Sequence, residues 1–194
     1  AGDEASRKRF IREAEAAAAV AHPNVVGVYQ VGELPASGTT YFVMQYIDGP
    51  TLQAEFPEGV AVPEAQARRI VGEVATALAA AHSRGLVHRD IKPANIMLDR
   101  ESGRVVVLDF GISAILERRS APGAEKLTAE GLSLGTPQYM SPEQAAARPV
   151  TDRSDVYSLG AVAFELVTGR PPFKGETAWD LIAASSFGGS VPLS

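Results

Sequence analysis

Apolar residues recur at helical spacing in three stretches of the chain. Over residues 5–20 and again over residues 63–84 they return every three or four positions, with charged residues between them. This spacing predicts two amphipathic helices, the first ending before Pro23 and the second before Gly85. Residues 155–168 are apolar on nearly every helical face, which predicts a third, buried helix.

Four shorter stretches are rich in the β-branched and aromatic residues that strands favour. Residues 25–33 and 40–46 flank the turn-rich sequence 34–38 and predict an antiparallel pair. Residues 96–99 and 105–110 predict a second hairpin.

The sequence from residue 109 to residue 143 has little periodicity. A loop of such length inside a compact domain is usually functional or mobile. A further partial helix is expected over residues 176–184.

Composition narrows the classes of function. The 194 residues are 45% hydrophobic and 21% charged, as in an ordinary globular domain. A net charge of −5 disfavours nucleic acid as a partner, and the longest apolar run, residues 74–81, is far too short to span a membrane. The absence of cysteine excludes disulfides and thiolate metal sites and favours a reducing compartment, so we expect a cytoplasmic domain, and a membrane anchor of a longer parent protein would lie outside this chain.

Two short motifs carry the candidate chemistry. The first, residues 88–95, reads His-Arg-Asp-Ile-Lys-Pro-Ala-Asn and supplies Asp90, Lys92 and Asn95. The second, Asp-Phe-Gly, begins at Asp109. A proton-accepting carboxylate, one cation and two further oxygen ligands are what the chemistry of Mg²⁺ and ATP needs. Either motif alone also occurs in solvated loops, but their order and their separation by a predicted hairpin are specific.

Together these motifs resemble the protein kinase superfamily, and residues 148–160 with the excess of arginine over lysine look most like the bacterial Ser/Thr kinases. The resemblance implies an α+β fold with two lobes. Residues 1–46 would form a partial small lobe with one helix and two strands, and residues 47–194 most of the helical large lobe. Because no Gly-rich loop or strand lysine precedes Phe10, and the family's last helices do not follow, we expect a fragment of a longer parent.

The resemblance also assigns catalytic roles. Asp90 would orient the substrate hydroxyl and receive its proton, and Lys92 would stabilise charge on the transferred phosphoryl group. Asn95 and Asp109 would hold Mg²⁺, so ATP and Mg²⁺ are the implied cofactors. Lys92 and Thr136 agree with members that act on Ser/Thr, which predicts protein substrates bearing these hydroxyls.

Five residues are assigned by resemblance to the nucleotide. Met44 would guard the back of the adenine pocket, the backbones of Gln45 and Ile47 would face adenine, and Met97 would also contribute to nucleotide binding. Glu13 matches the helix glutamate whose family partner is a lysine on an earlier strand.

Regulation is predicted around Arg89, the residue that in this family pairs with a phosphate on the activation segment. By resemblance, residues 109–143 are that activation segment, and counting back from Gly135 places Thr128 as the main autophosphorylation site and Ser133 as the alternative. Glu130 would act as a partial phosphate mimic, unless it is only a solvated loop charge.

Two more residues have structural roles by resemblance. Asp155 would accept backbone hydrogen bonds from the catalytic loop, and Glu143 would lack the arginine that usually pairs with it.

Two other functions remain open. One is a non-catalytic, kinase-like binding module, although such a module has no need to keep four polar groups that converge on a cation. The other, a small-molecule phosphotransferase of the aminoglycoside type, is weakened by Thr136 and the Ser-Pro-Glu sequence at residues 141–143. Autophosphorylation in trans would make a kinase homodimer a possible partner arrangement.

Overall fold

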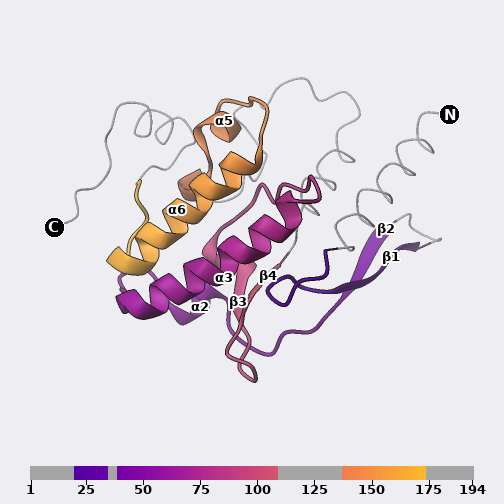
Figure 1. The fold of residues 1–194 in the computed structure, drawn as a ribbon, viewed down its shortest axis with the longest axis horizontal. Helices are drawn as coiled ribbons and strands as arrows, with labels where there is room; N and C mark the ends of the chain where they lie inside the picture. Colours follow the sequence, from indigo (N-terminus) through magenta and orange to yellow (C-terminus); the bar gives the residue numbers. More distant parts are fainter. Residues whose placement is uncertain (1–19, 35–38, 109–136, 174–194) are drawn as a thin grey trace.

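The structure is a computed structural model, and it describes residues 20–34, 39–108 and 137–173 (Figure 1). The elements in chain order are β1 (Val28–Leu34), β2 (Thr39–Met44), α2 (Leu52–Glu55), α3 (Glu64–His82), the 3-10 helix η1 (Pro93–Asn95), β3 (Ile96–Leu98), β4 (Val105–Val107), the 3-10 helix η2 (Pro137–Tyr139), α5 (Pro142–Ala145) and α6 (Asp152–Thr168). Helices beside two separate antiparallel hairpins confirm the predicted α+β class. The predicted helices over residues 5–20 and 176–184 lie outside the described residues, except for Val20.

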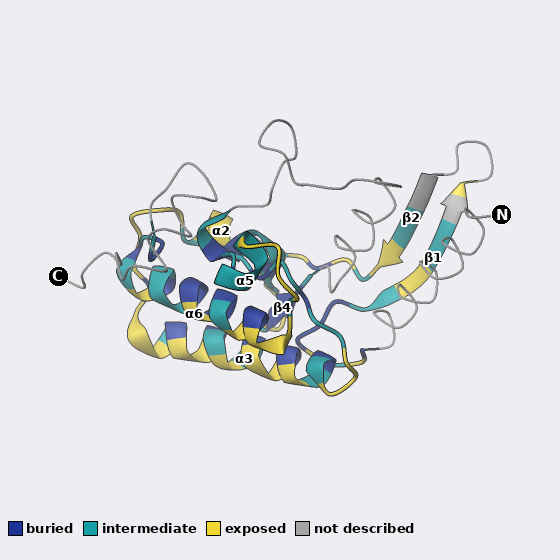
Figure 2. Ribbon diagram, turned by 90° about the horizontal axis from the view of Figure 1, so that it is seen from above, coloured by how far each residue is buried: buried dark blue, intermediate teal, exposed yellow. Residues whose placement is uncertain are grey.

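The helix predicted over residues 63–84 is confirmed as α3. It lies beside α6, and the two helices turn their buried residues toward the core (Figure 2). Fully buried side chains of α3, among them Ile70 and Val74, join Leu159 and Val162 of α6 in the main core. Within the described residues no helix combines the length and the apolar character that a membrane span requires.

Helix α6 differs from the prediction in two ways. It begins at Asp152, three residues earlier than expected, because Thr151 and Ser154 form a capping box that stabilises the first turn. It is also not buried on every side, since Val156 is 61% and Val167 51% exposed. The helix ends at Thr168, and Gly169 caps it with a positive φ of 73°, which suits glycine.

The second predicted hairpin is confirmed as β3 and β4, which pair antiparallel with Ile96 opposite Val107. Both strands are shorter than predicted. The segment after β2 runs along β3 and is bound to it through the backbone. The Leu98 N–H donates to the Pro50 carbonyl, and the Arg100 N–H donates to the Asp48 carbonyl. The approach is so close that a Cβ atom on Gly49 would lie 1.8 Å from the Leu98 carbonyl oxygen.

The first predicted hairpin is confirmed as β1 and β2, with Gly32 opposite Tyr41. The first strand begins at Val28 instead of residue 25, and the second ends at Met44 instead of residue 46. The chain before β1 differs because it binds strand β4, in the body that contains the helices: the Val26 N–H donates to Val107 and the Val107 N–H donates to Asn24. The hairpin itself extends away from that body (Figures 1 and 2).

The Asn24 side chain fixes this junction. Its Nδ2 donates to Glu73 Oε2 on α3 at 2.9 Å and to the Val105 carbonyl at 2.8 Å. Glu73 Oε2 also accepts the Val105 N–H at 2.7 Å, and Arg69 donates to Glu73 Oε1 at 2.7 Å. One carboxylate on α3 therefore ties the segment before β1 to strand β4.

Candidate active site

Three of the four residues predicted to carry the chemistry meet around one carboxylate. Lys92 Nζ lies 2.8 Å from Asp90 Oδ2, and Asn95 Nδ2 donates to the same oxygen at 2.8 Å. Asn95 Nδ2 also donates to the Asp90 backbone carbonyl at 2.8 Å. Because both side-chain contacts use Oδ2, Oδ1 is the Asp90 oxygen that is left to face a substrate. The Asp90 side chain is 31% exposed and so remains accessible.

The local backbone explains why these residues converge. Pro93 opens the short helix η1, where its missing N–H costs nothing, and the Asn95 N–H closes the turn on the Lys92 carbonyl at 2.9 Å. This turn folds Asn95 back onto Asp90. Strand β3 begins directly after it, at Ile96.

The Asn95 side chain fits a hard cation. Its amide nitrogen is committed to Asp90, so the oxygen Oδ1 is the atom that it offers to a ligand. Amide and carboxylate oxygens are suitable ligands for Mg²⁺. The Leu108 N–H donates to the Asn95 carbonyl at 2.9 Å, which brings the chain next to Asn95 one residue before Asp109. Asp109 itself lies outside the described residues.

Asp155 holds the backbone of the catalytic loop, as predicted. Its Oδ2 accepts the His88 N–H and its Oδ1 accepts the Arg89 N–H, both at 2.8 Å. His82 Nε2 is a third partner, at 2.7 Å from Oδ2. The carboxylate is 1% exposed. A buried carboxylate requires such a full set of donors, and this set places the loop on α6.

The His88 ring links the catalytic loop to the strand that leads toward Asp109. Its Nδ1 accepts the Asp90 N–H at 3.2 Å, and its Nε2 lies 2.7 Å from the Leu108 carbonyl. A carbonyl only accepts, so Nε2 must carry the proton and Nδ1 must be free of it. These bonds assign a neutral tautomer to a side chain that is 2% exposed.

Gln144 was not found from the sequence, although it reaches the site. Its Nε2 donates to the Arg89 carbonyl at 2.7 Å, across 55 positions of the chain. Arg89 itself has φ 71°, in the left-handed region that non-glycine residues rarely adopt. The only sequence signal was the Ser-Pro-Glu-Gln order, which predicts a capping box at the start of a short helix.

The residues assigned to the nucleotide lie on and near the segment after β2. Ile47 is 7% exposed and packs with Val26 and Val106, and Met97 packs against the same cluster. Met44 is 36% exposed. The Gln45 N–H is already donated to Gly27 at 2.7 Å, which leaves its carbonyl as the backbone group it could offer.

The end of the predicted activation segment is also tied to α6. Glu143 accepts a hydrogen bond from the Ser154 hydroxyl, and this bond holds the pKa of the Glu143 carboxyl below its ordinary value. Among the described residues, the partner of Glu143 is therefore a hydroxyl group, whereas the kinase resemblance pairs this glutamate with an arginine. The Tyr139 hydroxyl donates to Glu165, whose pKa is raised by burial.

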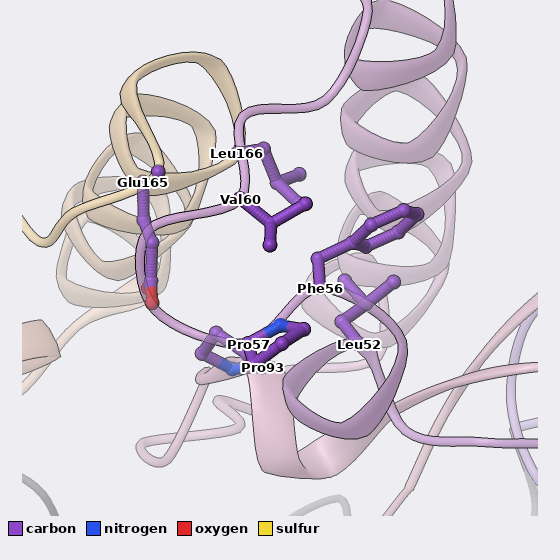
Figure 3. A pocket seen from close by; sticks show the side chains of 8 residues that line it. Leu52, Phe56, Pro57, Val60, Pro93, Glu165 and Leu166 are labelled. Atoms are coloured by element: carbon purple, nitrogen blue, oxygen red, sulfur yellow. The ribbon is translucent and has the colours of Figure 1, made fainter.

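A hollow lies between α2 and α6, beside the catalytic loop (Figure 3). Its lining is mostly apolar, with the Glu165 carboxylate at its edge: Leu52, Phe56, Pro57, Val60, Pro93, Glu165, Leu166 and Gly169. None of the residues assigned to the nucleotide lines it, so this hollow is not the predicted adenine site.

Several predicted site residues lie outside the described ranges: Glu13, Asp109, Thr128, Glu130, Ser133 and Thr136.

Comparison with known proteins identifies the family. The chain matches the protein kinase domain over residues 1–186. Serine/threonine-protein kinase PknB of Mycobacterium leprae is 44% identical over 171 residues, which are 87% of this chain and 26% of that protein. PknB of Mycobacterium tuberculosis (strain ATCC 25618 / H37Rv) is 45% identical over 172 residues, again 87% of this chain and 26% of the relative.

A solved structure agrees. The crystal structure of a point mutant of the Mycobacterium tuberculosis PknI kinase domain superposes with a TM-score of 0.66 at 34% identity and covers 89% of this chain and 61% of that chain. The chain therefore belongs to the protein kinase family, and within it to the bacterial Ser/Thr kinases, with a partial kinase fold. It spans about a quarter of the length of the curated relatives it matches. Protein kinases generally use ATP and Mg²⁺ and act on proteins.

Proposed function

We propose that this chain supplies the phosphoryl-transfer site of a Ser/Thr protein kinase, with Asp90 as the group that orients the substrate hydroxyl and receives its proton. The observation that carries the proposal is that Lys92 and Asn95 both bind Oδ2 of Asp90. A carboxylate held through one oxygen presents the other in a fixed direction. Fixed positioning is the main contribution that a protein makes to phosphoryl transfer.

Each remaining side chain then has a physical task. Lys92 carries a positive charge beside the reacting hydroxyl, where it would stabilise charge on the transferred phosphoryl group. Asn95 Oδ1 and Asp109 would hold the metal. When bound, Mg²⁺ neutralises charge on the phosphate oxygens of ATP. Ile47, Met97, Met44 and Gln45 would bind the base, and Glu13 would support the phosphate side of the site.

We also propose a regulatory role for Arg89. No carboxylate in the described part of the chain forms an ion pair with the Arg89 guanidinium, which supports its pairing with a phosphate instead. Thr128 is the proposed autophosphorylation site, with Ser133 as the alternative. Glu130 is the proposed partial mimic, and Thr136 would lie beside the substrate.

The proposal also covers the compartment of the reaction and its protein partners. We place the domain in the cytoplasm and its substrates among proteins that expose serine or threonine. Transfer to the activation segment would take place between two copies of the kinase. The cysteine-free sequence supports a reducing compartment.

The test compares wild-type full-length protein with Asp90→Asn, Lys92→Ala and Asn95→Ala, using labelled ATP, Mg²⁺ and an unstructured protein rich in serine and threonine. Each substitution is expected to lower transfer at least about 100-fold. Asp152→Asn, on the exposed start of α6, is the matched control and should retain wild-type transfer.

Two outcomes contradict the proposal in different ways. Retention of most of the transfer by Asp90→Asn would remove Asp90 from its role. If the wild-type protein binds Mg²⁺ and ATP, seen as a raised melting temperature, yet transfers nothing, the chain is a non-catalytic binding module.

A further inference from the structure

The peptide unit that joins Arg89 to Asp90 is held at both of its polar ends by side chains. Its carbonyl, on Arg89, accepts from Gln144 Nε2 at 2.7 Å. Its N–H, on Asp90, donates to His88 Nδ1 at 3.2 Å. The orientation of this peptide plane sets the direction in which the Asp90 side chain leaves the backbone. Gln144 therefore acts on the geometry of Asp90 without touching its carboxylate.

The backbone needs this support at Arg89. A φ of 71° places the residue in the left-handed region, where a side chain with a Cβ atom is disfavoured. Such a conformation persists only where the surroundings hold it. Two side chains do so: Asp155 accepts the Arg89 N–H at 2.8 Å, and Gln144 binds the Arg89 carbonyl. Asp155 lies on α6, whereas Gln144 lies on α5.

The Gln144 amide is itself oriented. Its Oε1 accepts the Ser141 N–H at 3.1 Å as one half of a capping box, and the Ser141 hydroxyl accepts the Gln144 N–H at 3.4 Å as the other half. With the oxygen turned toward Ser141, the nitrogen is the atom that points at Arg89. The Gln144 side chain thus takes part both in the cap at the start of α5 and in the contact with the catalytic loop.

Helix α5 begins at Pro142, within the last residues of the predicted activation segment. A shift of this helix would move Gln144 relative to the Arg89 carbonyl. We propose that Gln144 is a positioning residue for Asp90, which couples the placement of α5 to the direction of the catalytic carboxylate. The inference rests on the proposed role of Asp90 in phosphoryl transfer.

The sharpest variant is Gln144→Glu in the full-length protein. It keeps the shape and the oxygen that accepts from Ser141, but it replaces the donor with a carboxylate oxygen that faces the Arg89 carbonyl. We expect kcat to fall at least about tenfold, since a misplaced catalytic group is costly, while KM for ATP stays within about twofold. Gln144→Leu, which has neither polar atom, should lose a similar amount.

The pH dependence separates positioning from a loss of folding. A protonated carboxyl group can donate to the Arg89 carbonyl, whereas an ionised one cannot. The ratio of the Gln144→Glu kcat to the wild-type kcat should therefore rise as pH falls from 8 toward about 5.5, near the upper end of carboxyl titration. The same ratio for Gln144→Leu should stay flat.

Ser141→Ala is the matched control. It removes the hydroxyl half of the capping box but leaves the bond from Gln144 to Arg89 in place. It should lower the melting temperature of the protein while kcat stays within about twofold of wild type, because cap losses act on helix stability. An equal loss of kcat in Ser141→Ala and Gln144→Glu would overturn the inference, since capping alone would then explain both.

Asp90→Asn separates a failure of the role inferred for Gln144 from a failure of the proposed function. If Asp90→Asn is inactive and both Gln144 variants keep wild-type kcat, the positioning role of Gln144 is wrong and the proposed function stands. If Asp90→Asn retains transfer, the proposed function fails, and the inference fails with it.

Discussion

The catalytic-loop region, defined as residues 88–108 with α5 and α6, and the β1–β2 hairpin are held together in different ways. In the first, buried side chains bind backbone groups far away in the sequence, as Asp155 does with His88 and Arg89 across 67 and 66 positions. In the second, a backbone ladder with one register shift, between Val28 and Gln30, joins neighbouring strands, and large side chains such as Tyr29, 72% exposed, face outward. Long-range side-chain bonds to the backbone therefore gather where the candidate chemistry lies.

Asp155→Asn should have the largest effect on stability and so tests the first half of the comparison. An asparagine puts an NH₂ donor where one carboxylate oxygen now accepts, and it removes the charge that three donors surround. We expect a loss of about 3 kcal/mol in the free energy of unfolding, measured by urea titration. Asp152→Asn, exposed on the same helix, should change it by less than about 0.5 kcal/mol. Similar values for the two variants would contradict the comparison.

Gly49→Ala should have the next largest effect on stability, because it disturbs the contact of the segment after β2 with β3. The added Cβ atom would lie 1.8 Å from the Leu98 carbonyl oxygen, so one of the two backbones must move. We expect a loss of about 2 kcal/mol in urea titration.

The matched control for this substitution is Gly72→Ala. Gly72 lies in α3, where an added Cβ atom would meet no neighbouring atom within 4 Å, and alanine there should stabilise by roughly 0.5–1 kcal/mol. Two losses of equal size would show that the close approach at Gly49 is not the cause.

The two regions also differ in how much the sequence could predict. Local patterns sufficed for α3, for both hairpins and for the grouping of Asp90, Lys92 and Asn95, because spacing along the chain determines these features. The bond from Gln144 to Arg89 could not be predicted, since it depends on how α5 is placed in three dimensions.

Two predictions about α6 were wrong, and both errors have local causes in the sequence. The start of α6 was predicted too late because the capping pair, Thr151 and Ser154, precedes the apolar positions. The same helix was predicted to be buried on all sides, but hydrophobic content does not show which face is covered, and Val156 is exposed.

A smaller, pH-dependent effect on the free energy of unfolding is expected at Glu165 and Glu143, with opposite signs at the two residues. Burial raises the pKa of Glu165, so its stabilising contribution is full below the ordinary carboxyl value of 4.5 and is lost as pH rises through the raised value. The Ser154 bond lowers the pKa of Glu143, so its contribution is full above 4.5 and is lost as pH falls through the lowered value.

Relative to wild type, Glu165→Gln should therefore gain stability as pH rises from 4 to 8, and Glu143→Gln should lose stability over the same range. The differences should each stay below roughly 1 kcal/mol in urea titrations at both pH values, because both side chains are only partly buried and solvent still screens their charges. Equal pH slopes for the two variants would contradict the assigned causes.

The smallest effect is expected in the β1–β2 hairpin, from Tyr41→Phe. The Tyr41 ring lies over Gly32 on the opposite strand, where a Cβ atom would meet the ring at 2.4 Å, so the aromatic ring covers the bare backbone of the glycine. Phenylalanine keeps this ring and loses only an exposed hydrogen bond from Gln30 at 3.3 Å. We expect a change of less than about 0.5 kcal/mol in the free energy of unfolding, whereas Tyr41→Ala, which uncovers Gly32, should cost about 1 kcal/mol. A loss near that of Asp155→Asn in the phenylalanine variant would show that side-chain hydrogen bonds hold the hairpin as they hold the catalytic loop, and the contrast between the two regions would then be wrong.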